Sequence, residues 1–530
     1  MNYAALFSAP AIKQGGRASA IYAASGMADT QNQAALAAAY INQLKDQAAS
    51  VLGATIGASL QPLQYHGDFN WAWTDGIGVN SLSYNYISGA IAPAPNQPGI
   101  YRVGQTGSLA NLYQQLVTAL QWSFSEADRG ALQTAQTQSS AQATTLIQTY
   151  AATYGVPTQA QITAAQASVP WVQTALDYIV LYQVGYIWAG IKPNSPGLSL
   201  QSMQQAESLS NLLPYATPSA QPTIQALVAY LNALGPASRL MDMQSLGNYT
   251  IKQLKNNQIP SASNGGILLS NPPSGATYWP GWSSNTTVSQ ILQDLNNASQ
   301  QVTLQFSAQK SSSSSYNVAF SGSAGLSWMG DLLNISAGTS FRGDVAQAQG
   351  AGSTMNISMV YPGVTVLPLF PAAFQSNSTG TTGWLDEAVI YQAWSNQQAG
   401  PNASSGFSFG AGGVPSGIKL GVDGTGYLTA LVVSGYPTIT VNFTQGDYQQ
   451  FSSWLSTHTS VSVSLFGFIP LGSTSVDTYT ASASQSSSQA GFSLTLTPPA
   501  PGSSGQTIPL PNQTVPVLAA QLSWLGATPA

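Results

Sequence analysis

Residues able to transfer protons are few and scattered along the chain. Histidine occurs only at His66 and His458, and neither lies near a Gly-x-Ser-x-Gly nucleophile motif that a Ser-His-Asp mechanism would use. His66 and Asp68, with Asp75 nearby, form the best polar group, set among aromatic residues. A His-x-Asp spacing is common by chance, so the sequence favours a loop-stabilising role over metal binding.

Two adjacent carboxylates, Asp386 and Glu387, are of the residue type used in glycoside hydrolysis. Adjacent residues on a helix point in different directions, so these two cannot form a catalytic pair alone. Their position near the start of a predicted helix favours interaction with the helix dipole. We expect no catalytic residue, and a hydrolase that uses two dispersed aspartates is kept as an alternative.

Cofactor chemistry has no sequence support either. The chain has no cysteine, which excludes disulfides, cysteine-ligated zinc, iron–sulfur clusters and thiol catalysis. It also lacks a Walker loop, a Rossmann glycine fingerprint and a zinc-peptidase motif. The sequence therefore predicts a protein that is not an enzyme and has no cofactor and no metal.

Charge is scarce throughout the chain. Its 530 residues include 12 Lys plus Arg and 17 Asp plus Glu, so 5% are charged, against roughly a quarter in an average soluble domain. Nucleic-acid binding is excluded, because it needs clustered basic side chains.

Amides and hydroxyls do not titrate, which predicts acid tolerance. Low net charge weakens repulsion between copies, so we expect self-association into a homo-oligomer or larger assembly. An acid-adapted or secreted origin is the alternative explanation of the composition.

The chain changes character near residue 260. Apolar residues recur three or four apart before this point, which predicts a mainly α-helical bundle over 1–260 with an aromatic excursion of loops and short strands at 61–102. The helices are expected at 35–52, 109–120, 126–154, 158–191 with a kink at Pro170, 199–213, 219–234 and 236–258. The helix 126–154 should end where Gly155 and Pro157 follow.

Residues 261–530 read as mainly β and sandwich-like. Short alternating runs separated by Gly, Pro and Ser predict antiparallel strands, with short helices near 384–395 and 446–457. The strands are expected at 302–307, 318–320, 355–359, 364–369, 406–410, 417–422, 428–433, 438–443, 461–468, 492–496 and 515–525. The fold class is therefore α+β multidomain, an N-terminal helical bundle followed by a C-terminal antiparallel β-sandwich-like domain.

Two segments suggest membrane insertion. The stretch from Trp171 to Ile191 has the length of a bilayer span, although Gln173, Asp177 and Gln183 interrupt it and favour a central bundle helix. An alternating hairpin around the serine run 311–315 approaches a transmembrane hairpin, although surface strands of a sandwich alternate in the same way. The insertion candidates are Trp171, Tyr178, Tyr182, Tyr186, Trp188, Val302, Leu304, Phe306, Val318 and Phe320. A helical half joined to such a hairpin resembles pore-forming toxins in architecture alone.

Carbohydrate is a further ligand class that needs no charge, because sugars stack on aromatic rings. The candidate ligand surfaces are Trp71, Trp73, Trp279 and Trp282, although large aromatic side chains are more often buried. Nine Asn-x-Ser/Thr motifs occur, which a chain rich in these residues also produces by chance. The N-terminus does not resemble a signal peptide. We expect an extracellular or released protein, with acidic surroundings.

The sequence thus favours a non-enzymatic, self-associating protein that is membrane-active and toxin-like. The alternatives are a structural protein of a surface, particle or filament, and a carbohydrate-binding module or hydrolase. The partners expected are other copies of the chain and a lipid membrane or glycan. Dye leakage from liposomes at neutral and acidic pH would favour membrane activity, and ordered assemblies without lipid would favour the structural role.

Overall fold

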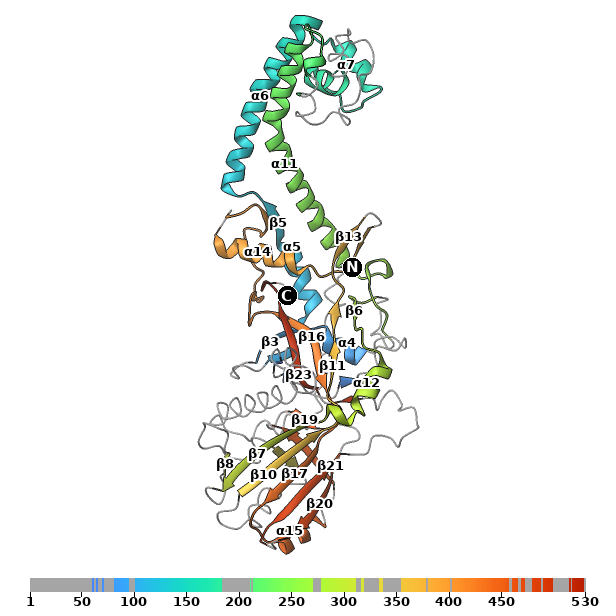
Figure 1. The fold of residues 1–530 in the computed structure, drawn as a ribbon, viewed down its shortest axis with the longest axis vertical. Helices are drawn as coiled ribbons and strands as arrows, with labels where there is room; N and C mark the ends of the chain where they lie inside the picture. The colour runs from blue at the N-terminus through green and yellow to red at the C-terminus, as the bar shows by residue number, and fades with distance from the viewer. Residues whose placement is uncertain are drawn as a thin grey trace. The chain divides into compact units, whose positions relative to one another are not determined.

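The computed structural model shows a chain of mixed helix and sheet, with antiparallel sheets (Figure 1). The residues it describes are 60–61, 63–64, 69–70, 81–94, 101–183, 210, 213–269, 278–310, 316–318, 333–336, 354–377, 380–400, 403–456, 460–465, 469–471, 479–487, 490–498, 514–515 and 517–528. The chain divides into two compact units. Unit 1 comprises Met1–Ala119, Gln253–Tyr391 and Gly412–Ala530, and unit 2 comprises Leu120–Lys252 and Gln392–Ala411.

Unit 1 contains a nine-stranded sheet. The strand order is β19-β18-β20-β21-β17-β10-β7-β8, and β9 pairs with β18. The strands are β7 (Val302–Lys310), β8 (Tyr316–Val318), β9 (Leu333–Ser336), β10 (Thr354–Tyr361), β17 (Thr438–Phe443), β18 (Ser460–Leu465), β19 (Ile469–Leu471), β20 (Tyr479–Gln485) and β21 (Phe492–Thr497). Buried and more exposed residues alternate along β10, β17 and β21, so one face of the sheet contributes to the core. On that face Phe451 of α15 (Tyr448–Leu455) stacks on Phe492, with ring centroids 4.6 Å apart.

A six-stranded sheet forms the other large part of unit 1. It joins β1 (Leu63–Gln64), β3 (Gly89–Pro93), β4 (Tyr101–Ser108), β11 (Thr365–Pro368), β16 (Gly426–Val433) and β23 (Val517–Trp524). The pair β1–β4 is parallel and the other pairs are antiparallel. Strand β16 lies at the centre, and its residues Leu428, Leu431 and Val432 are completely buried. Strands from the first and last parts of the chain therefore share one sheet.

Shorter elements complete unit 1. The helices are α4 (Ser81–Ile87), α5 (Leu109–Ala119), α12 (Val288–Leu295), the first residues of α14 (Glu387–Ala399), and the single turns η6 (Ala262–Asn264) and η7 (Ala298–Gln300). Three two-stranded sheets pair β2 (Phe69–Asn70) with β22 (Thr514–Val515), β6 (Trp282–Ser283) with β12 (Phe370–Pro371), and β13 (Gln375–Asn377) with β14 (Gly380–Thr382).

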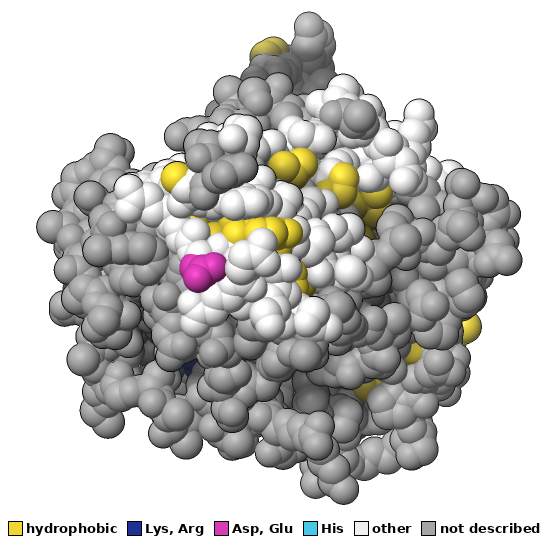
Figure 2. All heavy atoms as spheres, turned by 90° about the horizontal axis from the view of Figure 1, so that it is seen from below, with side chains coloured by type: hydrophobic (Ala, Val, Ile, Leu, Met, Phe, Trp, Pro, Cys, Tyr) yellow, Lys and Arg dark blue, Asp and Glu magenta, His cyan; other side chains and the backbone are white. Residues whose placement is uncertain are grey.

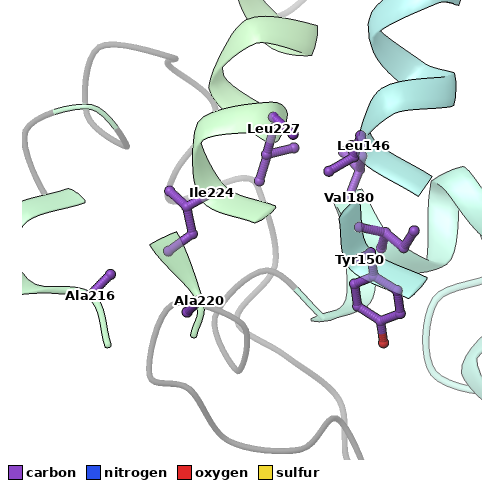
Figure 3. Close-up of a cluster of buried hydrophobic side chains, with 9 residues drawn as sticks. Leu146, Tyr150, Val180, Ala216, Ala220, Ile224 and Leu227 are labelled. Atoms are coloured by element: carbon purple, nitrogen blue, oxygen red, sulfur yellow. The ribbon is translucent and has the colours of Figure 1, made fainter. Parts of the chain in front are cut away.

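Unit 2 is built on two long helices, α6 (Glu126–Tyr154) and the part of α11 (Gln221–Asn257) up to Lys252. It also contains α7 (Gln159–Gln166), α8 (Ala175–Asp177), the π-helix η3 (Tyr178–Gln183), the turn η5 (Leu213–Tyr215), and β5 (Leu120–Ser123) paired with β15 (Gly406–Phe409). Leu146 and Tyr150 of α6 face Ile224 and Leu227 of α11 in a buried cluster (Figure 3). This cluster holds the two helices side by side (Figure 1).

Most predicted elements are confirmed where the structure describes them. Helix α6 has the predicted bounds because Ser125 caps its start, accepting from the Asp128 backbone N–H, and Gly155 ends it with a φ of 81°. The predicted hairpin is confirmed in the pairing of β7 with β8. The predicted helices near 109–120, 384–395 and 446–457 correspond to α5, α14 and α15.

Three predicted elements were wrong. A helix boundary expected at Pro236 is absent, because α11 continues through this residue and the buried Ala237 follows it. The helix expected from Trp171 begins instead at Ala175, where Thr174 and Asp177 form a capping box. No strand occurs at 417–422, because Gly417 and Gly421 adopt positive φ angles of 85° and 89°. The predicted helix 35–52 lies outside the described residues, and the predicted helix 199–213 lies largely outside them.

Candidate functional site: two uncharged surfaces

The exposed side of the nine-stranded sheet carries rows of hydroxyl and amide side chains. Antiparallel register aligns one row across β7, β10, β17, β21 and β20, and a second across the last four of these strands. The first row is Gln305, Ser358, Thr440, Thr495 and Ser482, and the second is Asn356, Asn442, Ser493 and Ser484. We call these nine residues the polar sheet face. None is buried and none is charged.

Local pairing explains why this side is uncharged but polar. The intervening residues, such as Ile357, Val441 and Leu494, are buried on the other side of the sheet, so their neighbours in sequence must point outward. Within the second row, the Ser493 hydroxyl donates across the strands to the Asn442 amide oxygen at 2.5 Å. Figure 2, seen from below, shows the described surface mainly in white, which marks uncharged polar side chains and backbone, with apolar patches and one small acidic patch.

A second uncharged surface lies on α6 in unit 2. Charged residues occur only in its first turn, at Glu126, Asp128 and Arg129, and none follows from 130 to 154. One stripe of exposed residues lines a shallow hollow of about 570 Å³: Gln133, Gln136, Thr137, Ser140, Ala141 and Thr144. We call these six residues the α6 face. Its residues recur at intervals of three and four, so they lie on one side of the helix.

Threonines of α6 direct their hydroxyl groups back toward the helix. The Thr137 hydroxyl donates to the Gln133 carbonyl at 2.9 Å, and the Thr144 hydroxyl donates to the Ser140 carbonyl at 3.2 Å. Their donors are therefore already used within the helix. The α6 face is less available for hydrogen bonds to water than its composition indicates.

The two carboxylates singled out by sequence have separate structural partners in unit 1. Asp386 Oδ1 accepts from the Val389 backbone N–H at 3.1 Å, and its own backbone N–H donates to the Tyr113 hydroxyl at 2.8 Å. Burial raises the pKa of Asp386, and hydrogen bonds from the backbone of Val389 and Ala388 oppose this rise. Asp386 therefore caps α14 and ties its start to α5.

Glu387 binds different residues from its neighbour. Its Oε1 accepts from the Tyr427 hydroxyl on β16, and its Oε2 accepts from the Ser523 hydroxyl on β23 at 3.5 Å. Burial, followed by the hydrogen bond with Glu387, raises the pKa of Tyr427. As predicted from their adjacency on the chain, the two carboxylates point to different partners. Both act as hydrogen-bond acceptors that fix α14.

The candidate sugar-binding tryptophans divide by burial. Trp282 is 3% exposed and lies against Trp384 and Tyr427, with ring centroids 6.3 and 6.4 Å away. Its face is therefore occupied by protein. Trp279 is half-buried and meets Tyr84 edge to face. Trp71, Trp73 and the polar group His66, Asp68 and Asp75 lie outside the described residues, as does His458.

The insertion candidates also have different environments. Trp171 is 75% exposed, whereas Tyr178 is 2% exposed within a small core cluster. Val302 and Leu304 are completely buried on the core side of β7. Tyr182 belongs to η3, Phe306 to β7 and Val318 to β8, but the structure does not describe their side chains. Tyr186, Trp188 and Phe320 lie outside the described residues.

Within the described segments, no helix has the length and hydropathy of a membrane span. The same residues contain no group of three or more side chains suited to hold a metal ion. Comparison with known proteins adds no functional assignment, because no family model, curated protein or solved structure matches this chain. The polar sheet face and the α6 face are therefore the best candidate sites.

Sequence reasoning missed both surfaces as sites. The signal for the sheet was present in the alternating Ser and Thr of β20 and β21, but the alignment of rows depends on strand order. The signal for α6 was its uncharged length. Which of its sides is exposed depends on packing with the rest of unit 2.

Proposed function

We propose that the protein is a non-enzymatic structural protein that self-associates, and that the α6 face is a contact between copies. The observation that carries this proposal is the exposed, uncharged side of a 29-residue helix. A solvent-exposed helix ordinarily relies on ion pairs three or four residues apart for local stability. From 130 to 154, α6 has no ionic side chain to form one.

The chemistry of the α6 face suits a neutral protein partner. Thr137 and Thr144 use their hydroxyl donors within the helix, so covering them removes few hydrogen bonds to water. Ala141 and Ser140 are small and leave the shallow hollow beside them, into which side chains of another helix can insert. Burying this face therefore requires no desolvation of charge.

A second copy of the chain is the partner that these properties favour. The formal net charge is only −5 over 530 residues, so repulsion between copies is weak. An uncharged face matches another uncharged face without ionic complementarity. We infer extracellular or released surroundings for such an assembly, including acidic ones, because the contact contains no group that titrates.

Sedimentation velocity across a concentration series, combined with electron microscopy without lipid, tests the proposal. We expect association that grows with protein concentration and changes little between about 50 and 500 mM salt, because ionic contacts alone would be screened. A chain that remains monomeric at every concentration would contradict self-association. Strong weakening by salt would contradict an uncharged contact.

Membrane contact is a second candidate, favoured by exposed apolar side chains in unit 2. Trp171 is 75% exposed and Val156 is 69% exposed. The hairpin is less suited to insertion, because Val302 and Leu304 would first have to leave the core, at about 1.5–3 kcal/mol for each side chain. Dye leakage from liposomes at neutral and acidic pH tests this candidate. Trp171→Ala should reduce leakage, and absence of leakage at both pH values would exclude it.

A further inference from the structure

Asparagines within Asn-x-Ser/Thr motifs share one environment in the described part of the chain. In Asn-x-Ser/Thr motifs, every asparagine whose burial is described is exposed: Asn248, Asn285, Asn297, Asn356, Asn377 and Asn442. The three buried asparagines, Asn257, Asn264 and Asn396, all lie outside such motifs. Every motif asparagine whose burial is described is therefore accessible, although asparagines outside motifs, such as Asn232, Asn256 and Asn296, are exposed as well.

The buried asparagines have structural roles that explain their position. The Asn257 amide donates to the Gly383 carbonyl at 2.9 Å, and the Asn264 amide donates to the Ile259 carbonyl at 2.6 Å. The Asn396 amide likewise donates to the Phe407 carbonyl at 2.8 Å. The interior thus uses asparagine where an amide must satisfy a backbone carbonyl.

Several motif asparagines are placed where an attached group would extend into solvent. Asn356 and Asn442 are register partners on β10 and β17, in the centre of the polar sheet face. Asn297 forms a local turn, in which its Oδ1 accepts from the Ser299 backbone N–H at 3.1 Å and from the Ser299 hydroxyl at 2.7 Å. The hydroxyl residue of this motif therefore already contacts the asparagine amide.

From this pattern we infer that the six exposed asparagines are sites of N-linked glycosylation. This is a modification that requires the motif and access by a transferase. The co-substrate is an oligosaccharide linked through phosphate to a lipid. The Asn Nδ2 forms a bond with C1 of the first sugar, while the C1–O bond to phosphate breaks and its electron pair stays on the phosphate oxygen. The Nδ2 proton passes to a base of the transferase, and no atom is oxidised or reduced.

The distribution of motifs separates the two uncharged surfaces. Residues 1–247 contain no Asn-x-Ser/Thr motif, so the α6 face has none. The polar sheet face contains two, at Asn356 and Asn442. Glycans would be attached within the polar sheet face, whereas no residue of the α6 face would carry one. This inference stands independently of self-association, since a monomer could carry the same glycans.

Mass spectrometry of the protein purified from the cells that naturally produce it tests the inference. We expect an intact mass above the 55.0 kDa of the unmodified chain. We also expect peptides with hexose-containing masses at the six exposed asparagines and none at Asn257, Asn264 or Asn396. An intact mass equal to that of the unmodified chain, or sugar absent from all six sites, would overturn the inference.

A matched pair of substitutions at one motif tests the chemistry at a single site. Ser358→Ala removes the hydroxyl that the Asn356 motif requires, whereas Ser358→Thr keeps it, and this position is only half-buried. In the producing cells, S358A should lose one glycan mass and S358T should retain it. Retention of the glycan at Asn356 in S358A would refute motif-dependent modification. The circular dichroism spectrum and melting temperature of both variants verify folding.

Discussion

The polar sheet face and the α6 face are both uncharged, but they become so in different ways. On the sheet, strand register directs amides and hydroxyls outward in rows, with Asn356 opposite Asn442. On α6, Thr137 and Thr144 return their hydroxyl donors to the helix backbone. Both surfaces lack charge, but the polar sheet face keeps its polar groups available to water. The α6 face has already used some of its hydroxyl donors in hydrogen bonds within the helix. The first suits attached sugar, and the second suits contact with protein.

The largest effect is expected from a substitution that disrupts the packing of α11, because this packing supports α6 and its exposed face. A Cβ atom at Gly247 of α11 would lie 2.1 Å from the Trp122 ring of β5. We expect Gly247→Ala to lower the free energy of unfolding of unit 2 by about 1–3 kcal/mol, because the ring must move. Denaturant unfolding followed by circular dichroism at 222 nm measures this change.

Gly235→Ala on the same helix is the matched control, because no atom lies within 4 Å of the added Cβ. It should change the stability of α11 by less than about 1 kcal/mol, because alanine favours helix over glycine but a Cβ before Pro236 disfavours the helical conformation. Equal effects of the two substitutions would contradict close packing of Gly247 against Trp122.

Lysines introduced on each uncharged surface test which of the two surfaces is the contact between copies. Thr137→Lys with Thr144→Lys should weaken self-association about tenfold or more, since the contact would bring lysines of two copies together without partners. Ser482→Lys with Thr495→Lys on the sheet face should leave association unchanged. Sedimentation velocity measures both variants. Weaker association of the sheet variant alone would assign the contact to the sheet face.

Removal of the sheet-face sugars should have a smaller effect. Asn356→Gln with Asn442→Gln keeps two amides but destroys both motifs. In protein from the producing cells, we expect lower solubility and faster protease cleavage, with association changed less than twofold. Loss of association would show instead that these glycans, or the asparagines themselves, belong to the contact.

The smallest expected effect concerns pH. In the folded state the pKa of the Asp386 carboxyl is raised above the value of about 3.9 expected in the unfolded state. The folded state therefore holds the carboxyl proton more tightly than the unfolded state does. The carboxyl therefore adds stability that is complete at low pH and is lost as pH rises through the folded-state pKa. Asp386→Asn retains the cap and should raise the melting temperature slightly at pH 7 but not at pH 3. An equal shift at both pH values would contradict this assignment.

Local signals predicted the elements better than their arrangement. Ser125 and Gly155 define α6 through capping, which needs only neighbouring residues. The start at Ala175 depends on a capping box between Thr174 and Asp177, which competed with the apolar periodicity around it. The order of a bundle over 1–260 and a sandwich-like domain over 261–530 remains a prediction. The compact units have other boundaries, because pairing between distant strands is not encoded in local composition.

Candidate sites were predictable only in part. The separate roles of Asp386 and Glu387 followed from their adjacency, whereas their partners Tyr113 and Tyr427 lie 273 and 40 residues away. Burial of Trp282 depends on aromatic neighbours from two other segments. Sequence could name the residue types, but three-dimensional packing determined which of them face solvent.

The central sheet of unit 1 also constrains the order in which the chain can fold. Strand β16 pairs with β3 near residue 91 and with β23 at Val517–Trp524, and Gln61 bridges to Ala520. The bridge from Gln61 to Ala520 spans more than 400 residues, and closing such a long loop slows folding. During synthesis the sheet must wait, with the edge of β16 unpaired, until residues 517–524 leave the ribosome. The growing chain is most exposed to aggregation during this interval, because an unpaired strand edge can pair with another chain.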